Sequence, residues 1–489
     1  MILNRSISVC YLFVTLYKRF NEMIHRFVII GGLLLSSVLL GCKDKSESQS
    51  HEQLETLQPI EIADNAHFFK RANGDPFFWL GDTAWLLLKK LDREAIAAYF
   101  DDRKKKGFNV IQVMVLHTLD VENVYGSKAL IEDQINTPKV IAGDSLNTAS
   151  YDYWDHMAYA IDLAEQKGLY VALVPVWGGN VNSGKVSVAQ AEEYGRFLGN
   201  RFKNNNIIWL NGGDTFGNQY IEVWNALGAS IHAETPQLLQ TFHPRGRQQS
   251  SDWFHTASWL DFNMFQSGHR TYDQDDSEKG FGEDNWRYVT VDYHLEPTKP
   301  TLDGEPSYEG IPQGLHDTLQ PLWNENDVRR YAYWSVFAGA AGFTYGHSAI
   351  MQFYTEKDGE GAYGNKMDWQ VALQAAGAGQ MQYLKQLMLS HTYMSRVPDE
   401  DLVVTQGERY NYLAATRGAD YVMIYTYTGR TIEVHMGKIE GNQVDALWYN
   451  PKDGSKLSIG TFKNEGIQVF DPPGEIHEGN DWVLLLESA

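Results

Sequence analysis

Eight short apolar segments alternate with helix-like segments between residues 77 and 389 of this 489-residue chain, and this order constrains the fold most strongly. Eight strands alternating with helices over roughly 310 residues are typical of an α/β chain folded as a (β/α)8 TIM barrel with insertions. The alternative is a doubly wound open sheet, but no glycine-rich phosphate turn follows the first segment. Strands are predicted over residues 77–82, 110–115, 170–176, 207–211, 238–242, 260–266, 300–304 and 342–346. Helices are predicted over residues 92–106, 152–167, 188–203, 218–234, 286–295, 327–341 and 370–389.

The pattern changes after Pro398, where short strand-like segments follow one another without helices between them. Such spacing, with glycine-containing turns, favours a β-sandwich. We therefore expect a barrel domain over residues 61–393 and a C-terminal β-sandwich domain over residues 394–489. The predicted strands of the second domain are 402–405, 412–416, 421–426, 431–435, 446–450 and 482–486.

The N-terminal region resembles an export signal. A basic start at 23–26 precedes the apolar segment 27–40, and Leu39-Leu40-Gly41-Cys42 is similar to a bacterial lipobox. We predict a signal peptide over residues 1–42, with Met23 as the true start, lipidation of Cys42, and a tether over residues 43–60. The chain would then be a lipoprotein of the bacterial cell envelope, at the outer membrane surface or facing the periplasm. A plain membrane anchor is the alternative.

Charge and cysteine content exclude some classes of function. The net charge of -21 argues against nucleic-acid binding, which needs basic patches. The only cysteines are Cys10 and Cys42, so the folded part has no disulfide or cysteine-metal framework. The chain has 14 Trp and 27 Tyr, which suit both sugar binding and β-rich cores.

Two predicted strands end in a carboxylate: Asp214 follows the fourth strand and Glu305 the seventh. Catalytic groups of a barrel lie at the carboxyl ends of its strands, and these two ends face each other across the mouth. Two carboxylates about 5 Å apart, one protonated and one ionised, cleave glycosidic bonds with retention of configuration. The alternatives are structural: Asp214 as a cap of helix 218–234, and Glu305 paired with Arg270 or Arg287.

Other polar and aromatic residues near the strand ends are candidates for binding a sugar, although each also fits a structural role. We expect Tyr345 to hydrogen-bond the nucleophile and Trp177 to stack on a sugar ring. The sequence has no short H-x-x-H or H-E-x-x-H pair, so we expect no metal site. No cofactor is implied, because the carboxylate pair suffices. The candidate binding residues are Asp82, Trp85, His117, Trp177, Asn211, His243, Gln266, Tyr345 and His347.

Several linked motifs resemble the apiosidase-like glycoside hydrolases of family 140, over about residues 65–390. They are FKRANGDPFFWLGDTAW at 69–85, GFNVIQ at 107–112, NGGD at 211–214 and DGEP at 303–306. The segments WYNP at 448–451, FDPP at 470–473 and DWVL at 481–484 are similar to a module named a “putative collagen-binding domain”. The resemblance implies Asp214 as acid/base and Glu305 as nucleophile. It also implies cleavage of apiose from the pectin rhamnogalacturonan II.

The motifs together predict a retaining glycoside hydrolase that cleaves a side-chain bond of a complex polysaccharide without a cofactor. We expect a monomer whose partners are the poly- or oligosaccharide and, through the lipid anchor alone, a membrane. One alternative is a non-catalytic carbohydrate- or protein-binding surface lipoprotein, against which the intact pair Asp214 and Glu305 counts. The other is a collagen-directed protein, but no motif for peptide cleavage occurs.

Overall fold

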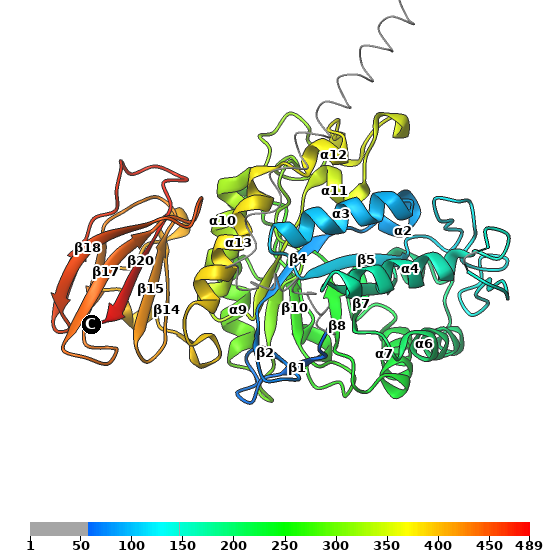
Figure 1. Ribbon diagram of the computed structural model, residues 1–489, viewed down its shortest axis with the longest axis horizontal. Coiled ribbons are helices and arrows are strands. Elements are labelled where there is room, and N and C mark those ends of the chain that lie inside the picture. Colours follow the sequence, from blue (N-terminus) through cyan, green and yellow to red (C-terminus); the bar gives the residue numbers. More distant parts are fainter. Residues whose placement is uncertain (1–56, 146) are drawn as a thin grey trace, which may run out of the picture. The chain divides into compact units, whose positions relative to one another are not determined.

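The computed structural model describes residues 57–145 and 147–489, in which the central sheet has nine strands in the order β8-β7-β6-β5-β4-β12-β11-β10-β9 (Figure 1). Neighbouring strands are parallel except for β9 (Gln248–Gln249), which runs antiparallel to β10. The other eight follow the predicted order, which confirms the barrel. They are β4 (Trp79–Thr83), β5 (Val110–Leu116), β6 (Tyr170–Val176), β7 (Ile207–Thr215), β8 (Gln240–Pro244), β10 (Asn263–Gln266), β11 (Thr301–Asp303) and β12 (Gly342–Tyr345).

The sheet is nearly closed between β8 and β10. The backbone N–H of Asp261 donates to the carbonyl of Gln240 at 2.8 Å, and the Thr241 hydroxyl donates to the carbonyl of Phe262. Alternate residues of each strand face opposite sides of the wall. In β5, Val110 therefore packs in the apolar cluster that fills the barrel, whereas Ile111 packs in the cluster beneath the outer helices.

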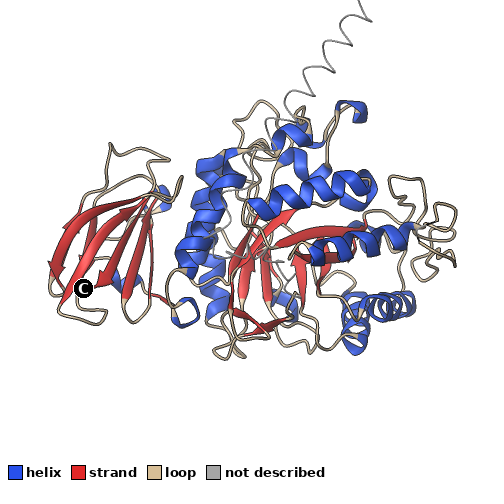
Figure 2. Ribbon diagram, in the orientation of Figure 1, coloured by secondary structure: helices blue, strands red, loops and turns tan. Residues whose placement is uncertain are grey.

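Helices surround the strands (Figure 2), and polar residues begin them. The Asp92 carboxylate accepts from the N–H of Ala95, and Asp152 and Ser187 form capping boxes. The long helices are α3 (Arg93–Lys105), α4 (Tyr153–Gln166), α6 (Val188–Phe202), α7 (Ile221–Glu234), α9 (Asn285–Tyr293), α10 (Glu325–Phe337) and α13 (Ala376–Leu389). Short ones are α2 (Leu87–Lys90), α5 (Gly178–Asn182), α8 (Ser251–Phe254), α11 (Ser348–Gln352) and α12 (Trp369–Ala372). The single helix predicted over 370–389 is thus two helices.

A small N-terminal sheet, absent from the prediction, packs against the barrel core. It consists of β1 (Ile60–Ile62), β2 (Phe69–Arg71) and β3 (Pro76–Phe77). The ring of Phe69 meets Phe262 edge-on, with centroids 5.2 Å apart. The predicted strand 77–82 is accordingly divided between β3 and β4. The predicted signal peptide, Cys42 and most of the predicted tether lie outside the described residues.

The C-terminal module has two antiparallel sheets, as a β-sandwich requires (Figure 2). Their apolar faces meet in one cluster that includes Val434, Phe470 and Leu484. The prediction of a strand at 402–405 is wrong, because Glu400–Leu402 is a 3-10 helix and only Val403 forms a bridge. The larger sheet has the order β13 (Val397–Pro398), β14 (Leu413–Arg417), β15 (Tyr421–Thr426), β20 (Trp482–Ser488), β17 (Gln443–Tyr449), β18 (Lys456–Lys463), and the smaller pairs β16 (Ile432–His435) with β19 (Ile467–Phe470).

Barrel and module belong to one compact unit, and α10 connects them. The Arg329 guanidinium binds both carboxylate oxygens of Asp481, at 2.7 and 2.8 Å, and both side chains are fully buried. Beside this pair, the rings of Tyr333 and Tyr425 stack with centroids 4.8 Å apart. The module is therefore packed on the barrel through buried charged and aromatic groups.

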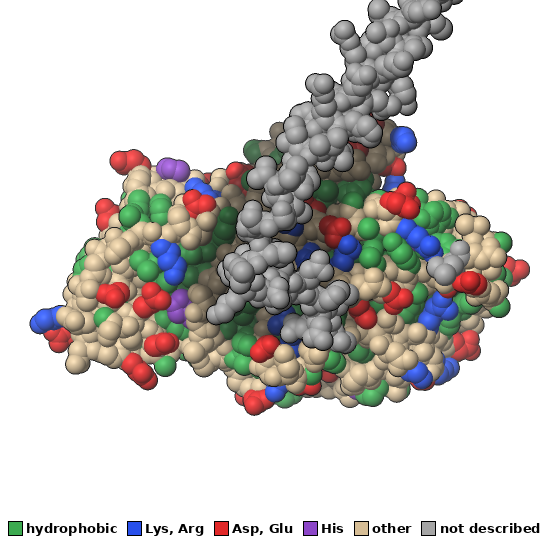
Figure 3. All heavy atoms as spheres, in the orientation of Figure 1, with side chains coloured by type: hydrophobic (Ala, Val, Ile, Leu, Met, Phe, Trp, Pro, Cys, Tyr) green, Lys and Arg blue, Asp and Glu red, His purple; other side chains and the backbone are tan. Residues whose placement is uncertain are grey.

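Among the described residues, no helix combines the length and apolarity that crossing a bilayer needs. On the face of these residues that Figure 3 draws, acidic side chains are scattered and basic ones lie between them. The charge on this face is thus spread rather than gathered in one patch.

Candidate active site

The end of β7 is bent so that Asp214 leaves the strand. Gly212 pairs with His243 of β8, but the next paired residue is Thr215, so Gly213 and Asp214 form a bulge. Gly212, Gly213 and Asp214 all have positive φ, of 91°, 105° and 47°. A Cβ on Gly212 would lie 2.6 Å from the His243 carbonyl oxygen, and one on Gly213 the same distance from the Trp177 ring. Because the two glycines have no Cβ, the His243 carbonyl and the Trp177 ring can pack against them. Asp214, whose backbone is strained, lies outside the hydrogen-bond ladder between β7 and β8.

Asp214 is half-buried in a site that favours its protonated form. Burial, followed by the negative charge of Glu305, raises the pKa of Asp214 from 3.8 to about 6 against the opposing effect of Arg245 and His243. The alternative role as a helix cap is wrong, because α7 begins at Ile221 with Tyr220 in the N-cap position. Asp214 can thus keep a proton at mildly acidic pH.

Glu305 follows β11, is only 7% exposed, and lies between two histidines. His269 Nε2 is 3.1 Å from Glu305 Oε1, and His243 Nε2 is 3.3 Å from Oε2. Burial alone would raise the pKa of this carboxyl, but the adjacent imidazoles of His243 and His269 outweigh it and lower the pKa from 4.5 to about 2. Arg270 forms an ion pair with Asp276 instead, so Glu305 does not depend on that arginine.

Aromatic rings line the inner wall beside Glu305. Trp85 meets His243 edge-on at 5.3 Å between centroids, and Trp177 lies 5.5 Å from Trp85. The Trp85 indole N–H donates to the hydroxyl of Tyr308 at 3.2 Å. Burial and then the charge of Glu305 raise the pKa of Tyr308 well above its ordinary value, so this hydroxyl stays protonated. The site therefore combines ring faces with hydroxyl and imidazole donors, the groups that bind sugars.

A cleft of about 770 Å³ opens in front of Asp214, of a size usual for a ligand site. Gln266, 4% exposed, reaches this cleft with a side-chain oxygen that has no hydrogen-bond partner among the described residues. Tyr363 stands at the cleft on the 3-10 helix Ala362–Gly364. Burial and then the charges of Glu305 and Asp214 raise the pKa of Tyr363 to about 12. Its hydroxyl therefore lies within the field of both carboxylates.

The structure does not bring all predicted binding residues to this cleft. Asp82 is fully buried, accepts from the Tyr99 hydroxyl at 2.5 Å and lies 3.4 Å from Arg103, so it holds α3 rather than a sugar. Asn211 is also fully buried, and its amide donates to the carbonyl of Trp224 on α7 at 2.9 Å. The assignment of both residues to substrate binding is corrected for the same reason: each side chain is fully buried and contacts groups inside the protein.

Tyr345, the last residue of β12, and His347, just beyond it, are likewise structural. Tyr345 donates to Glu309 Oε2 at 2.6 Å, not to Glu305, which corrects the expectation that it bonds the nucleophile. His347 caps α11 by accepting from the N–H of Ala349 at 3.0 Å, and burial lowers its pKa to about 4. His117 is half-buried beside the loop after β5 and does not line the cleft, whereas Trp85, Trp177, His243 and Gln266 lie at the site.

Three functional residues escaped the sequence analysis: His269, Tyr308 and Tyr363. His269 lies three residues beyond Gln266, the end of β10, and Tyr308 lies three residues beyond Glu305, so a wider search would have included both. Tyr363 lies eighteen residues beyond Tyr345, the end of β12, and nothing in its neighbours marks it. No cluster of three or more His, Cys, Asp or Glu side chains suited to a metal occurs within 57–145 and 147–489.

Comparison with known proteins identifies both parts of the chain. The family described as “Apiosidase-like, catalytic domain” matches residues 63–395, and “Putative collagen-binding domain of a collagenase” matches residues 397–487. A solved structure described as a glycoside hydrolase is 46% identical, with a TM-score of 0.84, over 88% of this chain and 97% of that one. A glycoside hydrolase of family 5 from Bacteroides vulgatus ATCC 8482 is 42% identical, with a TM-score of 0.83, over 88% and 93%. No curated protein matches. The chain belongs to the apiosidase-like family, and it is a glycoside hydrolase.

Proposed function

We propose that this enzyme cleaves a side-chain glycosidic bond of a complex polysaccharide with retention of configuration, using Asp214 as acid/base and Glu305 as nucleophile. One observation carries the proposal: the negative charge of Glu305 helps to raise the pKa of Asp214, and the two carboxyl groups have opposite pKa shifts. The pKa of Asp214 is raised to about 6 and that of Glu305 lowered to about 2. An acid and a nucleophile need this division.

In the first step, the ionised Glu305 attacks the anomeric carbon while Asp214 gives its proton to the leaving oxygen. The glycosidic bond breaks and an ester joins the sugar to Glu305. In the second step, Asp214 takes a proton from water, the water oxygen attacks the same carbon, and the ester bond breaks. His243 and His269 hold Glu305 in place, and they favour its ionised form before the attack and after the ester is cleaved.

For the substrate, we propose apiose removed from rhamnogalacturonan II, which the family resemblance supports. The first experiment incubates the protein with this pectin and with other plant and microbial glycans, and identifies released sugars by chromatography. Proton NMR of the first product then reports its anomeric configuration. Release of an inverted sugar would overturn the proposed mechanism.

Two variants test the residue roles. Glu305→Gln should abolish turnover, because an amide cannot form the glycosyl ester. Asp214→Ala should slow substrates with poor leaving groups far more than activated aryl glycosides, and azide should rescue it to a glycosyl azide of retained configuration. Glu192→Gln, at an exposed residue of α6 away from the cleft, is the matched control and should stay active. Equal losses on both substrate types in Asp214→Ala would argue against the acid/base role.

We also propose that lipid on Cys42 anchors the enzyme in the cell envelope, on the support of the lipobox-like sequence alone. The wild type should partition into detergent with the membranes, and Cys42→Ala should become soluble. A wild type found wholly in the soluble periplasm would refute the anchor.

A further inference from the structure

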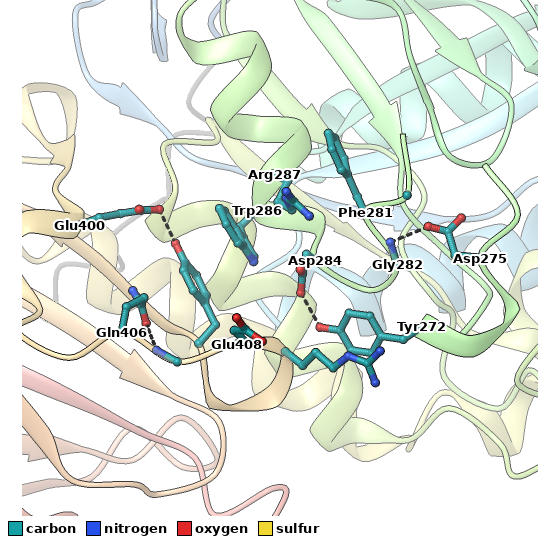
Figure 4. Close-up of a pocket in the computed structure, with 14 residues that line it drawn as sticks. Tyr272, Asp275, Phe281, Gly282, Asp284, Trp286, Arg287, Glu400, Gln406 and Glu408 are labelled. Carbon is teal, nitrogen blue, oxygen red and sulfur yellow. Dashed lines mark hydrogen bonds between the residues drawn. The ribbon is translucent and has the colours of Figure 1, made fainter. Parts of the chain in front are cut away.

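A second recess, of about 490 Å³, lies where the barrel meets the module (Figure 4). This volume falls within the range of about 300–1,000 Å³ that is usual for ligand sites. One wall comes from barrel segment 272–287 and the other from module segment 400–412. The recess is lined by Tyr272, Asp275, Gly280, Phe281, Gly282, Asp284, Trp286, Arg287, Glu400, Gln406, Gly407, Glu408, Arg409 and Tyr412.

Both walls carry aromatic rings, and guanidinium groups lie over rings of the barrel wall. Trp286 of the barrel stacks on Tyr412 of the module, with centroids 4.2 Å apart and planes at 6°. The Arg287 guanidinium lies 4.8 Å from the Phe281 ring, and that of Arg409 lies 4.8 Å from the ring of Tyr272. Arg409 thus reaches from the module to an aromatic ring of the barrel. Rings with adjacent charged donors suit a sugar, which has apolar C–H faces and hydroxyl edges.

The module wall is held in shape before any ligand arrives. Arg430 donates to the carbonyls of Asn411 at 2.9 Å and Thr405 at 2.8 Å, so both ends of the segment are tied down. The Gln406 side chain bonds Leu413 on both its amide and its carbonyl. Arg409 itself has a φ of 51°, which costs about 1–2 kcal/mol for a non-glycine residue. A rigid segment that keeps a strained arginine in the recess is typical of a binding site.

Charged groups remain free to bind there. The hydroxyl groups of Tyr272 and Tyr412 donate hydrogen bonds to the carboxylates of Asp284 and Glu400, respectively (Figure 4). Among the described residues, by contrast, the side chains of Arg287, Glu408 and Arg409 have no hydrogen-bond partner. They offer guanidinium donors and a carboxylate acceptor, which together match vicinal hydroxyl groups.

The recess and the catalytic cleft share one segment of chain. Arg270 and residues 276–279 line the cleft, whereas Tyr272, Asp275 and residues 280–282 line the recess. Resting on the proposed function, we infer that the recess is a remote subsite for a hydroxyl-rich sugar of the same polysaccharide, held jointly by barrel and module. A polymer bound at the cleft would cross segment 270–282 to reach it. The module then contributes to substrate binding through Glu408 and Arg409.

The test uses rhamnogalacturonan II as the probe and the full chain throughout. In affinity electrophoresis, Glu305→Gln should be retarded by the polysaccharide, and adding Arg409→Ala should weaken its binding by about tenfold, the loss expected for one charge-assisted hydrogen bond. In the active enzyme, Arg409→Ala and Glu408→Ala should raise KM for the polymer by a similar factor. Neither variant should change kcat, and neither should change the activity on an aryl glycoside. Arg196→Ala, at an exposed arginine of α6, is the matched control.

Thermal unfolding of each variant checks that it is folded, and Glu408→Ala gives an independent reading if Arg409→Ala is unstable. Equal retardation of the parent and both variants, or no retardation of the parent, overturns the subsite. These readouts are separate from the proposed chemistry. Wild type that releases no sugar defeats the proposed function, whereas the binding of Glu305→Gln still decides the subsite.

Discussion

The interaction between Asp214 and Glu305 predicts how removing one charge changes the other carboxyl group. The pKa of Asp214 is raised from 3.8 to about 6, a difference of about two pH units and roughly 3 kcal/mol. Burial is the largest cause and the charge of Glu305 the second, while Arg245 and His243 act in the opposite direction. Glu305→Gln should therefore lower the pKa of Asp214 from about 6 toward its ordinary value of 3.8, and the part of the shift that is due to burial should remain.

The assay needs no substrate: an NMR titration of protein labelled with 13C at the aspartate carboxyl groups, with Asp214→Asn to assign the signal. Glu278→Gln removes the same charge from the same cleft but is not among the groups that shift Asp214, so its titration should match the wild type. A pKa for Asp214 that is unchanged or higher in Glu305→Gln would refute the coupling, and with it the main support for the mechanism.

The same pKa values set the direction of the pH dependence. Asp214 must be protonated, so kcat/KM should fall as pH rises through about 6, and Glu305 must be ionised, so activity should fall only as pH approaches about 2. A pH–rate profile of the wild type measures both limbs. An activity that increases between pH 6 and 9 would contradict the assignment.

Three further predictions concern single residues. Asp481→Ala should lower the free energy of unfolding in denaturant by about 3–5 kcal/mol, because it leaves the buried Arg329 without its carboxylate partner. Adding Arg329→Met to that variant should recover much of the loss. A cost below about 1 kcal/mol, typical of an exposed pair, would show that the interface is hydrated. Tyr363→Phe should lower kcat/KM by about tenfold with an unchanged melting temperature, because only a hydroxyl near the reacting carboxylates is lost. Unchanged kinetics would show that this hydroxyl takes no part in the reaction. Gly213→Ala should lower both stability and activity, because residue 213 has a φ of 105° and the new Cβ would lie 2.6 Å from the Trp177 ring. Full activity and stability would show that the bulge at residues 213 and 214 can relax.

The fold was predictable because the strand–helix alternation is local and repeated. Apolar segments such as 110–115 and 170–176 are long and carry no competing pattern, so their type and order follow from composition and spacing. The failures are at short or polar elements. Strand β18 has exposed and half-buried residues throughout, so it lacks an apolar signal, and Val403 is apolar although it forms only one bridge.

For the site, position at a strand end was enough to select Asp214, Glu305, His243, Trp85 and Trp177, because parallel strands of a barrel deliver their ends to one face. Position could not decide where a side chain points. Asp82 and Tyr345 also stand at strand ends, yet buried partners on α3 and at Glu309 hold them inside. A carboxylate at such an end turns toward the cleft or the protein according to which partners the packed chain supplies.

The opposite pKa shifts of the two carboxyl groups follow only from the tertiary structure. Sequence order and apolar periodicity are properties of neighbouring residues, and they were sufficient for the barrel, the sandwich and the carboxylate pair. A pKa depends on burial and on charges within a few ångströms, which here come from segments far apart in the chain. The pKa of Glu305 is lowered because His243 and His269 converge on it, and the pKa of Asp214 is raised because folding buries it near Glu305. No stretch of sequence contains that proximity, since it exists only once the barrel has closed.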